Sequence, residues 1–472
     1  MKRLIILLAF LSGWAFSAEA IDHPSLLFTR RGAAVVRAAA GTNAAFDASV
    51  AEVVAAADRA LNEPIVVPVP KDGGGGYTHE KHKDNYYVMY YSGIAYQLTG
   101  NEAYARKVAD MLHAYAELYP TLGYHPVTLS AIRGRLFWQT LNECVWLVHT
   151  AIAYDCVYDY IPETERNRLE TDLFRPYADF LMNGTADNRA NRKMFNLVHN
   201  HGTWSAAAVG MIGFVMGDDD MVDMALYGSD KSGRNGGFML QLDRLLSPDG
   251  YFTEGAYYLR YAIWPFMLFA ECIDHNRPQI GIFDYRDAIL GKAMNALLQM
   301  NYGGVFMKFN DALTKQLDCQ ELIFAVDIAY RAYRNPMLLD VADRFQHKFL
   351  PCEAGYAVAS DLASGKKSPL VFRSALYRDG ADGTEGGIAV FRNDSDGDDS
   401  ALTLKATSHG LSHGHYDKLT IAYYDNGGVI LPDYGASRFL NIEAKYKGHY
   451  TRENKSFAMQ TIAHNTVTVD RK

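Results

Sequence analysis

The segment His199-Asn-His-Gly-Thr-Trp204 places two imidazoles and an amide directly before an apolar run that continues to Val215. The run predicts a helix, and the polar residues would stand at its N-terminus. Free backbone N–H groups and the helix dipole favour an anion there, so Asn200 and His201 are candidates to hold a carboxylate. The alternative is an asparagine cap beside two packing histidines, and the segment alone leaves both readings open.

A second segment, residues 249–261, surrounds Glu254 and Arg260 with aromatic residues that include Tyr257 and Tyr258. Aromatic rings can stack on a sugar while an arginine grips its carboxylate. A tyrosine hydroxyl can also transfer a proton once cationic neighbours lower its pKa from about 10. An aromatic core helix explains the segment equally well, so a sugar-binding wall and a packing role both stay open.

Histidines concentrate in a third segment, where His409, His413 and His415 occur within seven residues of a glycine-containing turn before a predicted strand. Packing explains three such histidines poorly, so we interpret the segment as functional. Asp433 and His464 lie farther along the chain. Histidine and carboxylate ligands together suit zinc, so one or two of these histidines with Asp433 and His464 form a candidate metal site.

Polar residues also crowd the start of a helix expected at residues 137–160. Residues four apart share a helix face, which would pair Trp138 with Asn142 and Gln139 with Glu143. Together with Arg135, such a face could grip sugar hydroxyls and carboxylates. An ordinary polar helix end is the alternative.

Apolar residues at helical spacing predict a series of helices with no convincing strands between them. The expected helices span residues 44–62, 84–99, 102–118, 137–160, 163–183, 198–216, 236–247, 257–275, 285–300, 318–334 and 336–348. Such a series favours stacked hairpins, which in secreted glycan-active enzymes close into a ring or an incomplete ring. The glycine-rich segment Lys71 to Tyr77 lacks the spacing of a phosphate-binding motif, so we expect a linker or a mobile lid.

After Pro351 the composition becomes strand-like. Strands are expected at residues 387–391, 401–405, 418–424, 428–431 and 466–469, with a hairpin turn at Asp425-Asn-Gly-Gly428. These strands predict the opening of an antiparallel β-sandwich that is cut short at the C-terminus, because they are too few for two packed sheets. The expected division is a signal peptide at 1–20, a helical domain at 21–350 and a β-domain at 351–472.

The first twenty residues have the features of a signal peptide: Lys2 and Arg3, an apolar run, then small residues up to Ala20. We therefore expect a periplasmic or secreted protein, and no apolar stretch is long enough to predict a membrane span. The net charge of -8 argues against nucleic acid as a partner. A cleft that concentrates cationic side chains can still bind an acidic glycan. The five dispersed cysteines are expected to be buried free thiols.

Taken together, these segments resemble the heparinase II/III-like superfamily, and within it the oligoalginate lyases of polysaccharide lyase family 17. The resemblance extends from about residue 22 to the end of the sequence. Its motifs are His23-Pro-Ser-Leu-Leu-Phe28, Asn200-His-Gly-Thr-Trp204, Thr253-Glu-Gly-Ala-Tyr-Tyr-Leu-Arg-Tyr261, His413-Gly-His-Tyr-Asp-Lys418, Leu431-Pro-Asp-Tyr-Gly435 and Thr461-Ile-Ala-His-Asn-Thr466. The resemblance implies an incomplete (α/α) toroid followed by an antiparallel β-sandwich, and exolytic cleavage of alginate oligomers to unsaturated monouronate.

The resemblance also implies roles for individual residues. Asn200 and His201 would neutralise the substrate carboxylate, and Tyr258 would donate a proton to the leaving oxygen. His413 and Tyr450 would close over the reacting sugar from the second domain, Tyr450 being a candidate base. The motif does not say which of the adjacent residues Tyr257 and Tyr258 faces the cleft.

Two further sets of residues follow from the resemblance. A structural zinc site would be formed by His415, Asp433 and His464, and no organic cofactor is expected. Substrate contacts would come from Arg135, Trp138, Gln139, Asn142, Tyr257, Arg260 and Arg438. The expected partner is an acidic polysaccharide or oligosaccharide such as alginate, with no nucleic acid and no membrane span, while a homodimer is left open.

β-Elimination explains why these residue types occur together. The proton on carbon 5 of a uronate is too weakly acidic for a side-chain base unless the adjacent carboxylate is neutralised, which calls for donors such as Asn200 and His201. Three alternatives remain: a glycosaminoglycan lyase with the same apparatus, a glycoside hydrolase using Glu143 and Glu254 as paired acids, and a non-catalytic glycan-binding protein.

Overall fold

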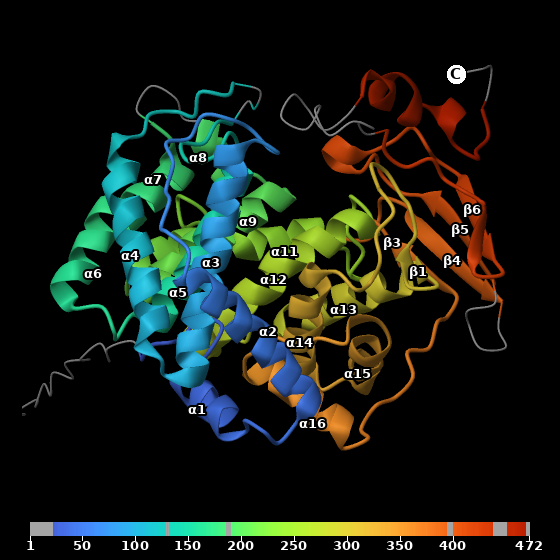
Figure 1. Ribbon diagram of the computed structural model, residues 1–472. Coiled ribbons are helices and arrows are strands. Elements are labelled where there is room, and N and C mark those ends of the chain that lie inside the picture. The colour runs from blue at the N-terminus through green and yellow to red at the C-terminus, as the bar shows by residue number, and fades with distance from the viewer. Residues whose placement is uncertain are drawn as a thin grey trace, which may run out of the picture.

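The structure, a computed structural model of the chain, describes residues 22–128, 130, 132–185, 190–393, 400–437 and 451–468. A helical part at residues 22–363 is followed by a smaller C-terminal part, residues 375–468, built on one sheet (Figure 1). The helices are α1 (Arg30–Ala38), α2 (Ala44–Leu61), α3 (Tyr77–Thr99), α4 (Glu102–Leu118), α5 (Thr140–Val157), α6 (Glu163–Leu169), α7 (Arg175–Asn183), α8 (Ala190–Phe195), α9 (Asn200–Val215), α10 (Asp219–Tyr227), α11 (Phe238–Leu245), α12 (Ala256–Asn276), α13 (Tyr285–Gln299), α14 (Gln320–Tyr333), α15 (Pro336–Val341) and α16 (Glu353–Ala363).

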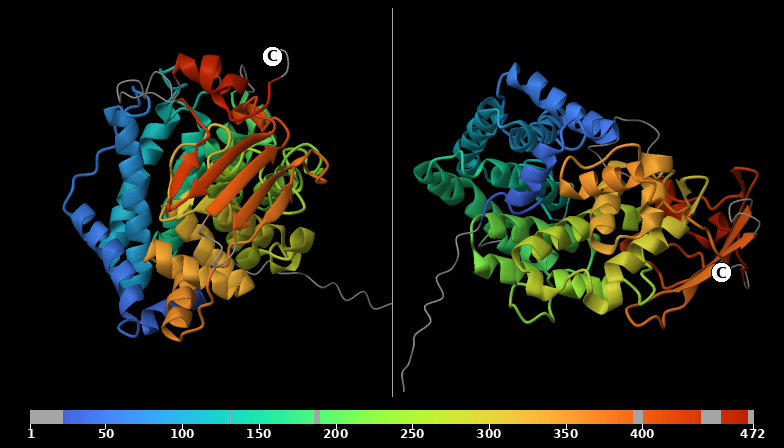
Figure 2. Two further views of the ribbon diagram at one scale, coloured as in Figure 1. Left: turned by 90° about the vertical axis from the view of Figure 1, so that its right-hand side faces the viewer. Right: turned by 90° about the horizontal axis from the view of Figure 1, so that it is seen from below.

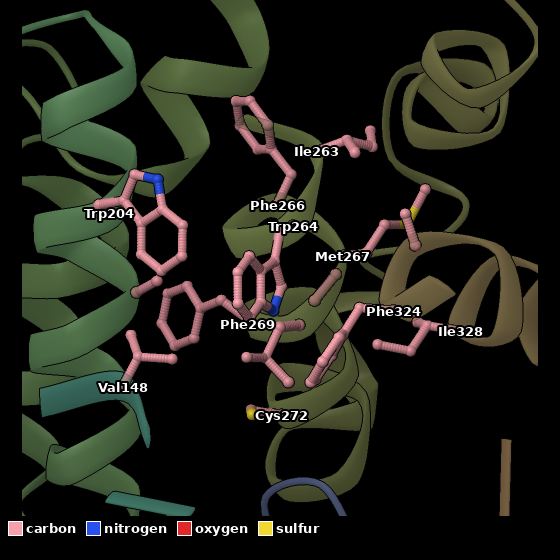
Figure 3. Close-up of a cluster of buried hydrophobic side chains, with 14 of the residues drawn as sticks. Val148, Trp204, Ile263, Trp264, Phe266, Met267, Phe269, Cys272, Phe324 and Ile328 are labelled. Carbon is pink, nitrogen blue, oxygen red and sulfur yellow. The ribbon is translucent and has the colours of Figure 1, made fainter. Parts of the chain in front are cut away.

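Five of these helices, α3, α5, α9, α12 and α14, pack side by side in chain order and form the inner wall of an incomplete toroid. Side chains at similar depth meet: His149 of α5 lies on Tyr86 of α3, and Trp264 of α12 contacts Trp204 of α9 and Phe324 of α14 (Figure 3). Farther along the helices, Gly93 of α3 lies beside Ala153 of α5, Gly210 of α9 beside Phe269 of α12, and Glu271 of α12 pairs with Arg331 of α14. The contacts keep the same order along both helices of each pair, so these pairs are parallel and their N-termini lie at the same end of the toroid.

Burial explains which helices form this wall. From Gly202 to Val215 every residue of α9 is buried, as expected of a helix that is apolar on all sides. Outer helices such as α4 bury one face only, and side-chain caps fix their starts. Asn101, for example, accepts a hydrogen bond from Ala103 N at the start of α4.

The C-terminal part contains a five-stranded antiparallel sheet in the order β3-β4-β5-β6-β7, which lies against one side of the helical part (Figure 2). Its strands are β3 (Ala375–Arg378), β4 (Gly387–Asn393), β5 (Ser400–Ala406), β6 (Thr420–Asp425) and β7 (Gly428–Leu431), while β1 (Asn301–Tyr302) and β2 (Val305–Phe306) form a small hairpin in the helical part. The expected turn joins β6 to β7, with Asn426 and Gly427 both at positive φ.

Several expected elements differ from those observed. The helix expected at 84–99 begins at Tyr77, where Asp72 accepts hydrogen bonds from Thr78 and His79 and stabilises the first turn. The first turns are polar and show no apolar spacing, so the sequence did not reveal them. The expected helix at 137–160 begins only at Thr140, since Gln139 is extended. The segment 466–468 is not a strand, and residue 469 lies outside the described residues.

Four helices were missed: α1, α8, α10 and α16. All are short, so few apolar residues repeat at helical spacing. Helix α16 lies after Pro351, where composition had predicted strands, and it packs against α14. All five cysteines are buried free thiols, as predicted. Among the described residues, no helix has the length and apolar character needed to cross a membrane.

Candidate active site

Asn200 and Glu254 meet at the N-terminal ends of α9 and α12. Asn200 donates from Nδ2 to Glu254 Oε2 at 2.8 Å, and both side chains are buried. His199 caps α9 by accepting a hydrogen bond from His201 N at its Nδ1, so its Nε2 faces Glu254 Oε1 at 3.3 Å. Burial alone would raise the pKa of Glu254, but the contacts of His199, His413 and Asn200 bring it below the ordinary value.

His201 stands one residue into α9, beside His199, with ring centroids 5.0 Å apart. Burial, together with the neighbouring His199, lowers the pKa of His201 to about 3. Its imidazole is therefore neutral near neutral pH. It can donate a hydrogen bond to an anion, aided by the N-terminal dipole of α9, but it brings no full positive charge.

Tyr258 and His413 bring the two parts of the molecule together. Their rings stack with centroids 3.8 Å apart and planes 16° apart, and Tyr258 is 9% exposed. The His413 ring lies between two carboxylates: its Nδ1 is 3.1 Å from Asp311 Oδ2, and its Nε2 is 3.9 Å from Glu254 Oε1. A candidate proton-transfer pair therefore lies next to the candidate carboxylate-binding residues.

Tyr257 has a different environment from its neighbour. Arg260 places its guanidinium over the Tyr257 ring, 4.7 Å from the centroid, and pairs with Glu321 at the start of α14. Arg260 is 6% exposed. The sequence could not choose between the two tyrosines, and the structure brings Tyr258, not Tyr257, into contact with His413.

Two groups of residues have the composition and spacing of a metal site within the described part of the chain. His199, Glu254 and His413 form one, beside Asn200 and Tyr258; His415, Asp417 and His464 form the other, in the C-terminal part. In each group the ligand atoms lie within 4.8 Å of one another. In the second group His415 Nδ1 and His464 Nε2 are buried and make no hydrogen bond. Two buried imidazole nitrogens without a hydrogen bond, both in the same group of residues, are the arrangement expected of ligands to a bound cation.

The other nitrogens of these two histidines are held by carboxylates. His464 Nδ1 lies 2.9 Å from Asp433 Oδ2, and His415 Nε2 lies 2.9 Å from Asp311 Oδ1. This arrangement is typical of metal-binding histidines, whose second nitrogen is fixed by a carboxylate. Asp433, nominated from the sequence, thus contacts His464 directly, while Asp417 lies in the group although the sequence did not nominate it.

The segment before α5 is shaped by Glu143, which is fully buried. Its Oε1 accepts hydrogen bonds from the backbone N–H groups of three successive residues, Arg135, Leu136 and Phe137, at 2.6, 2.8 and 2.9 Å. Burial raises the pKa of Glu143. Glu143 therefore folds the loop that carries Arg135 and Trp138 and does not present an acid to a ligand.

The expected shared helix face is only partly observed. Gln139 precedes the helix and donates from its side chain to Asn142 Oδ1 at 2.9 Å, while Trp138 lies in the loop. Trp138 lies next to Gly74 of the glycine-rich segment, at the start of α3. The guanidinium of Arg135 lies over Tyr119 and Phe180. Arg438 and Tyr450, both expected at the site, lie outside the described residues.

Sequence reasoning missed Asp311, Glu321 and Asp417 as members of the site. Asp311 lies in the loop after β2, between an apolar stretch and α14, with no motif around it. Asp417 stood inside the histidine-rich segment, and its neighbours could have drawn attention to it. Glu321 is two residues into α14 and looks like an ordinary first-turn acid.

Comparisons with known proteins agree with this architecture. A family model described as alginate lyase matches residues 51–304, and one described as heparinase II/III-like, C-terminal, matches residues 376–472. The fold is also similar to that of a heparinase III, with a TM-score of 0.55 and 16% identity over 89% of this chain and 62% of that chain. These matches, with the fold and the site, define a heparinase-like helical toroid joined to an antiparallel sheet.

Two curated relatives are much closer in sequence. An exo-oligoalginate lyase of Saccharophagus degradans is 45% identical over 449 residues, 95% of this chain and 60% of the relative. An alginate lyase of Stenotrophomonas maltophilia is 47% identical over 407 residues, 86% of this chain and 54% of the relative. This chain belongs to the alginate lyase family. It spans 60% and 54% of the lengths of these two relatives.

Proposed function

We propose that this protein is a polysaccharide lyase that cleaves alginate oligosaccharides by β-elimination and releases unsaturated monouronate from a chain end. The observation that carries the proposal is the meeting of Asn200 and His201, at the N-terminus of α9, with the stacked pair Tyr258 and His413. The names of the two curated relatives, an exo-oligoalginate lyase and an alginate lyase, support both the substrate and the exolytic mode.

The first requirement of the reaction is to neutralise the uronate carboxylate. Asn200 is fixed by Glu254 at 2.8 Å, and His201 is held neutral by burial, so both act as fixed hydrogen-bond donors. A preorganised donor aimed at a developing enolate is worth about 3–4 kcal/mol of transition-state stabilisation. The parallel inner helices add their N-terminal dipoles at the same end, which favours an acidic substrate despite the net charge of -8.

The second requirement is to move two protons. A base removes the proton on carbon 5, and an acid protonates the oxygen that leaves carbon 4 as the double bond forms. Tyr258 serves as the acid, beside His413, and Tyr450 is the candidate base. Each proton transfer contributes a rate increase of about a hundredfold to ten-thousandfold.

The environment of the carboxylates argues against a glycoside hydrolase. That reaction needs two carboxyl groups facing each other across the sugar. Glu143 is enclosed by three backbone N–H groups, and Glu254 is 0% exposed and bound to Asn200. Neither is available as a free acid. A binding protein without activity would have no use for the paired Tyr258 and His413.

The substrate contacts are expected on the rim of the cleft. Trp138, Gln139 and Asn142 offer a ring and amides at the start of α5, where the neighbouring loop is held by Glu143. Tyr257, Arg135, Arg260 and Arg438 complete the proposed set. Arg260 is paired with Glu321 in this structure. Its guanidinium would therefore be shared between Glu321 and the carboxylate of a bound uronate.

Zinc is the proposed metal of the C-terminal part, held by His415 and His464 with oxygen from Asp417. Asp433, nominated as a ligand from the sequence, would instead fix His464 through its other nitrogen. The orphaned nitrogens of the two histidines support the site, and nitrogen with oxygen ligands suits zinc. The metal would cross-link the loop between β5 and β6, which carries His415, to the C-terminal segment that carries His464, so its role is structural. For localisation, the N-terminal apolar segment supports export to the periplasm or the medium.

The experiment that tests the reaction type uses alginate oligomers in isotopically labelled water. A lyase adds no water across the broken bond, so we expect unsaturated products without incorporated solvent oxygen. Products that carry the solvent oxygen and lack the double bond would show hydrolysis and overturn the proposal.

A further inference from the structure

Asp311 is the residue through which the helical part holds the histidine segment of the C-terminal part. It lies in the loop between β2 and α14, is 3% exposed, and bonds with both of its oxygens. Oδ2 is 3.1 Å from His413 Nδ1, and Oδ1 accepts from His415 Nε2 at 2.9 Å and Asn454 Nδ2 at 3.1 Å. Its backbone N–H also donates to the His413 carbonyl at 3.3 Å.

The residues next to Asp311 extend this contact. Asn310 accepts from Lys405 Nζ at 2.5 Å, and that lysine, 1% exposed, also pairs with Asp417 at 2.5 Å. Ala312 accepts through its carbonyl from Ala436 N at 2.9 Å. Three successive residues of the helical part therefore dock on the C-terminal part, and the central one is charged and bound on both sides.

The two histidines held by Asp311 have different surroundings. His413 stacks on Tyr258, whereas His415 turns its orphaned Nδ1 toward the group that contains His464. No other described carboxylate bonds to both histidines. Within the described part of the chain, the carboxylate of Asp311 thus connects the ring stacked on Tyr258 directly to the candidate metal group.

We propose that Asp311 is a positioning residue that fixes the His413 ring on Tyr258 and ties the placement of that ring to the candidate metal group. The inference rests on the proposed lyase function for its effect on rate, but its geometric content does not. Two charge-assisted hydrogen bonds fix two imidazoles at once, so the catalytic ring is ordered before substrate binds. Asp311 does not touch the reacting atoms.

Asp311→Asn tests the proposal, because the amide keeps the shape but offers an acceptor to only one of the two imidazoles. We expect kcat on alginate oligomers to fall about tenfold to a hundredfold, the range supplied by one charge-assisted hydrogen bond. KM should change by less than about threefold, since no substrate contact is removed. Asp311→Glu retains the charge and should recover part of the turnover lost in Asp311→Asn. If Asp311→Asn does not fold, Asp311→Glu is used in its place for the comparison with the wild type.

Asp155→Asn is the matched control. Asp155 is 1% exposed and holds His23 Nδ1 at 2.7 Å and two backbone N–H groups at 2.8 Å, near the C-terminus of α5 and away from the cleft. It should lower thermal stability as Asp311→Asn does while leaving kcat unchanged. Equal losses of kcat in both variants would overturn the proposal.

A double-variant cycle separates positioning from general stability. If Asp311 acts through His413, then adding Asp311→Asn to His413→Gln should lower kcat by less than about threefold more. Fully additive losses would overturn the proposal. Histidine-selective NMR provides a readout independent of activity: the His413 Nδ1 proton signal should be lost in Asp311→Asn and kept in Asp155→Asn. If the wild type cleaves no uronate, the proposed function fails, and this signal still decides the positioning role.

Discussion

Replacing Tyr258 with phenylalanine removes one oxygen atom and leaves the ring. The ring stacks on His413 at 3.8 Å and is 9% exposed, so the packing around it should survive. The free energy of unfolding should fall by no more than about 1.5 kcal/mol, the usual net contribution of one hydrogen bond. Turnover should fall about a hundredfold to ten-thousandfold, because the proton donor to the leaving oxygen is lost.

The assay is the initial rate of double-bond formation on alginate oligomers at saturating substrate, with thermal unfolding measured on the same samples. Tyr257→Phe is the matched control, since its ring lies under Arg260 at 4.7 Å and has no contact with His413 among those described. It should retain most of the turnover. Normal turnover in Tyr258→Phe with a large loss in Tyr257→Phe would transfer the role to the neighbour, and normal turnover in both would remove this pair from the mechanism.

Three more outcomes follow from other parts of the structure. Burial lowers the pKa of His82 to about 3 and of His149 to about 4, from 6.5. Below pH 6.5 the unfolded chain binds these protons and the folded one does not. Each of these two histidines should therefore lower the free energy of unfolding by about 1.4 kcal/mol per pH unit as the pH falls from 6.5 toward its folded pKa. Urea titration at several pH values should show this slope, and His149→Gln should reduce it. Chelation should lower the melting temperature before it lowers the activity of still-folded enzyme, and Asp433→Ala should do the same; an unchanged melting temperature in both would remove the metal site. Glu143→Ala frees the loop that carries the proposed substrate contacts, so KM should rise several-fold more than kcat falls, and an unchanged KM would contradict the role of that loop.

Much of the fold could be predicted because its signals are local. The helices at 44–61 and 102–118 have clear apolar spacing and asparagine caps, and their observed bounds match the expected ones within a residue. The turn at Asn426 and Gly427 was equally clear, because both residues tolerate positive φ. Helix α16 was missed because it is short and follows Pro351, where the composition favoured strands, and its partner α14 is not its sequence neighbour.

The candidate site was predictable where several unusual residues follow one another. The segments around Asn200 and His413 met this condition, and the structure brings both to Glu254. Asp311 could not be found in this way, because its importance comes from where the loop after β2 meets the C-terminal part. Arg260 shows the opposite case: its residue type suggested a free cation, whereas Glu321, far along the chain, pairs with it.

The measurement that tests the account most directly is ultraviolet absorbance of the unsaturated uronate during incubation with alginate, heparan sulfate, hyaluronan and chondroitin in parallel. The expected result is a steady rise with alginate oligomers, monouronate as the main product, and little or no rise with the other three glycans. A rise with heparan sulfate and none with alginate would keep the elimination chemistry but contradict the substrate. Cleavage of alginate without any rise in absorbance would contradict β-elimination itself.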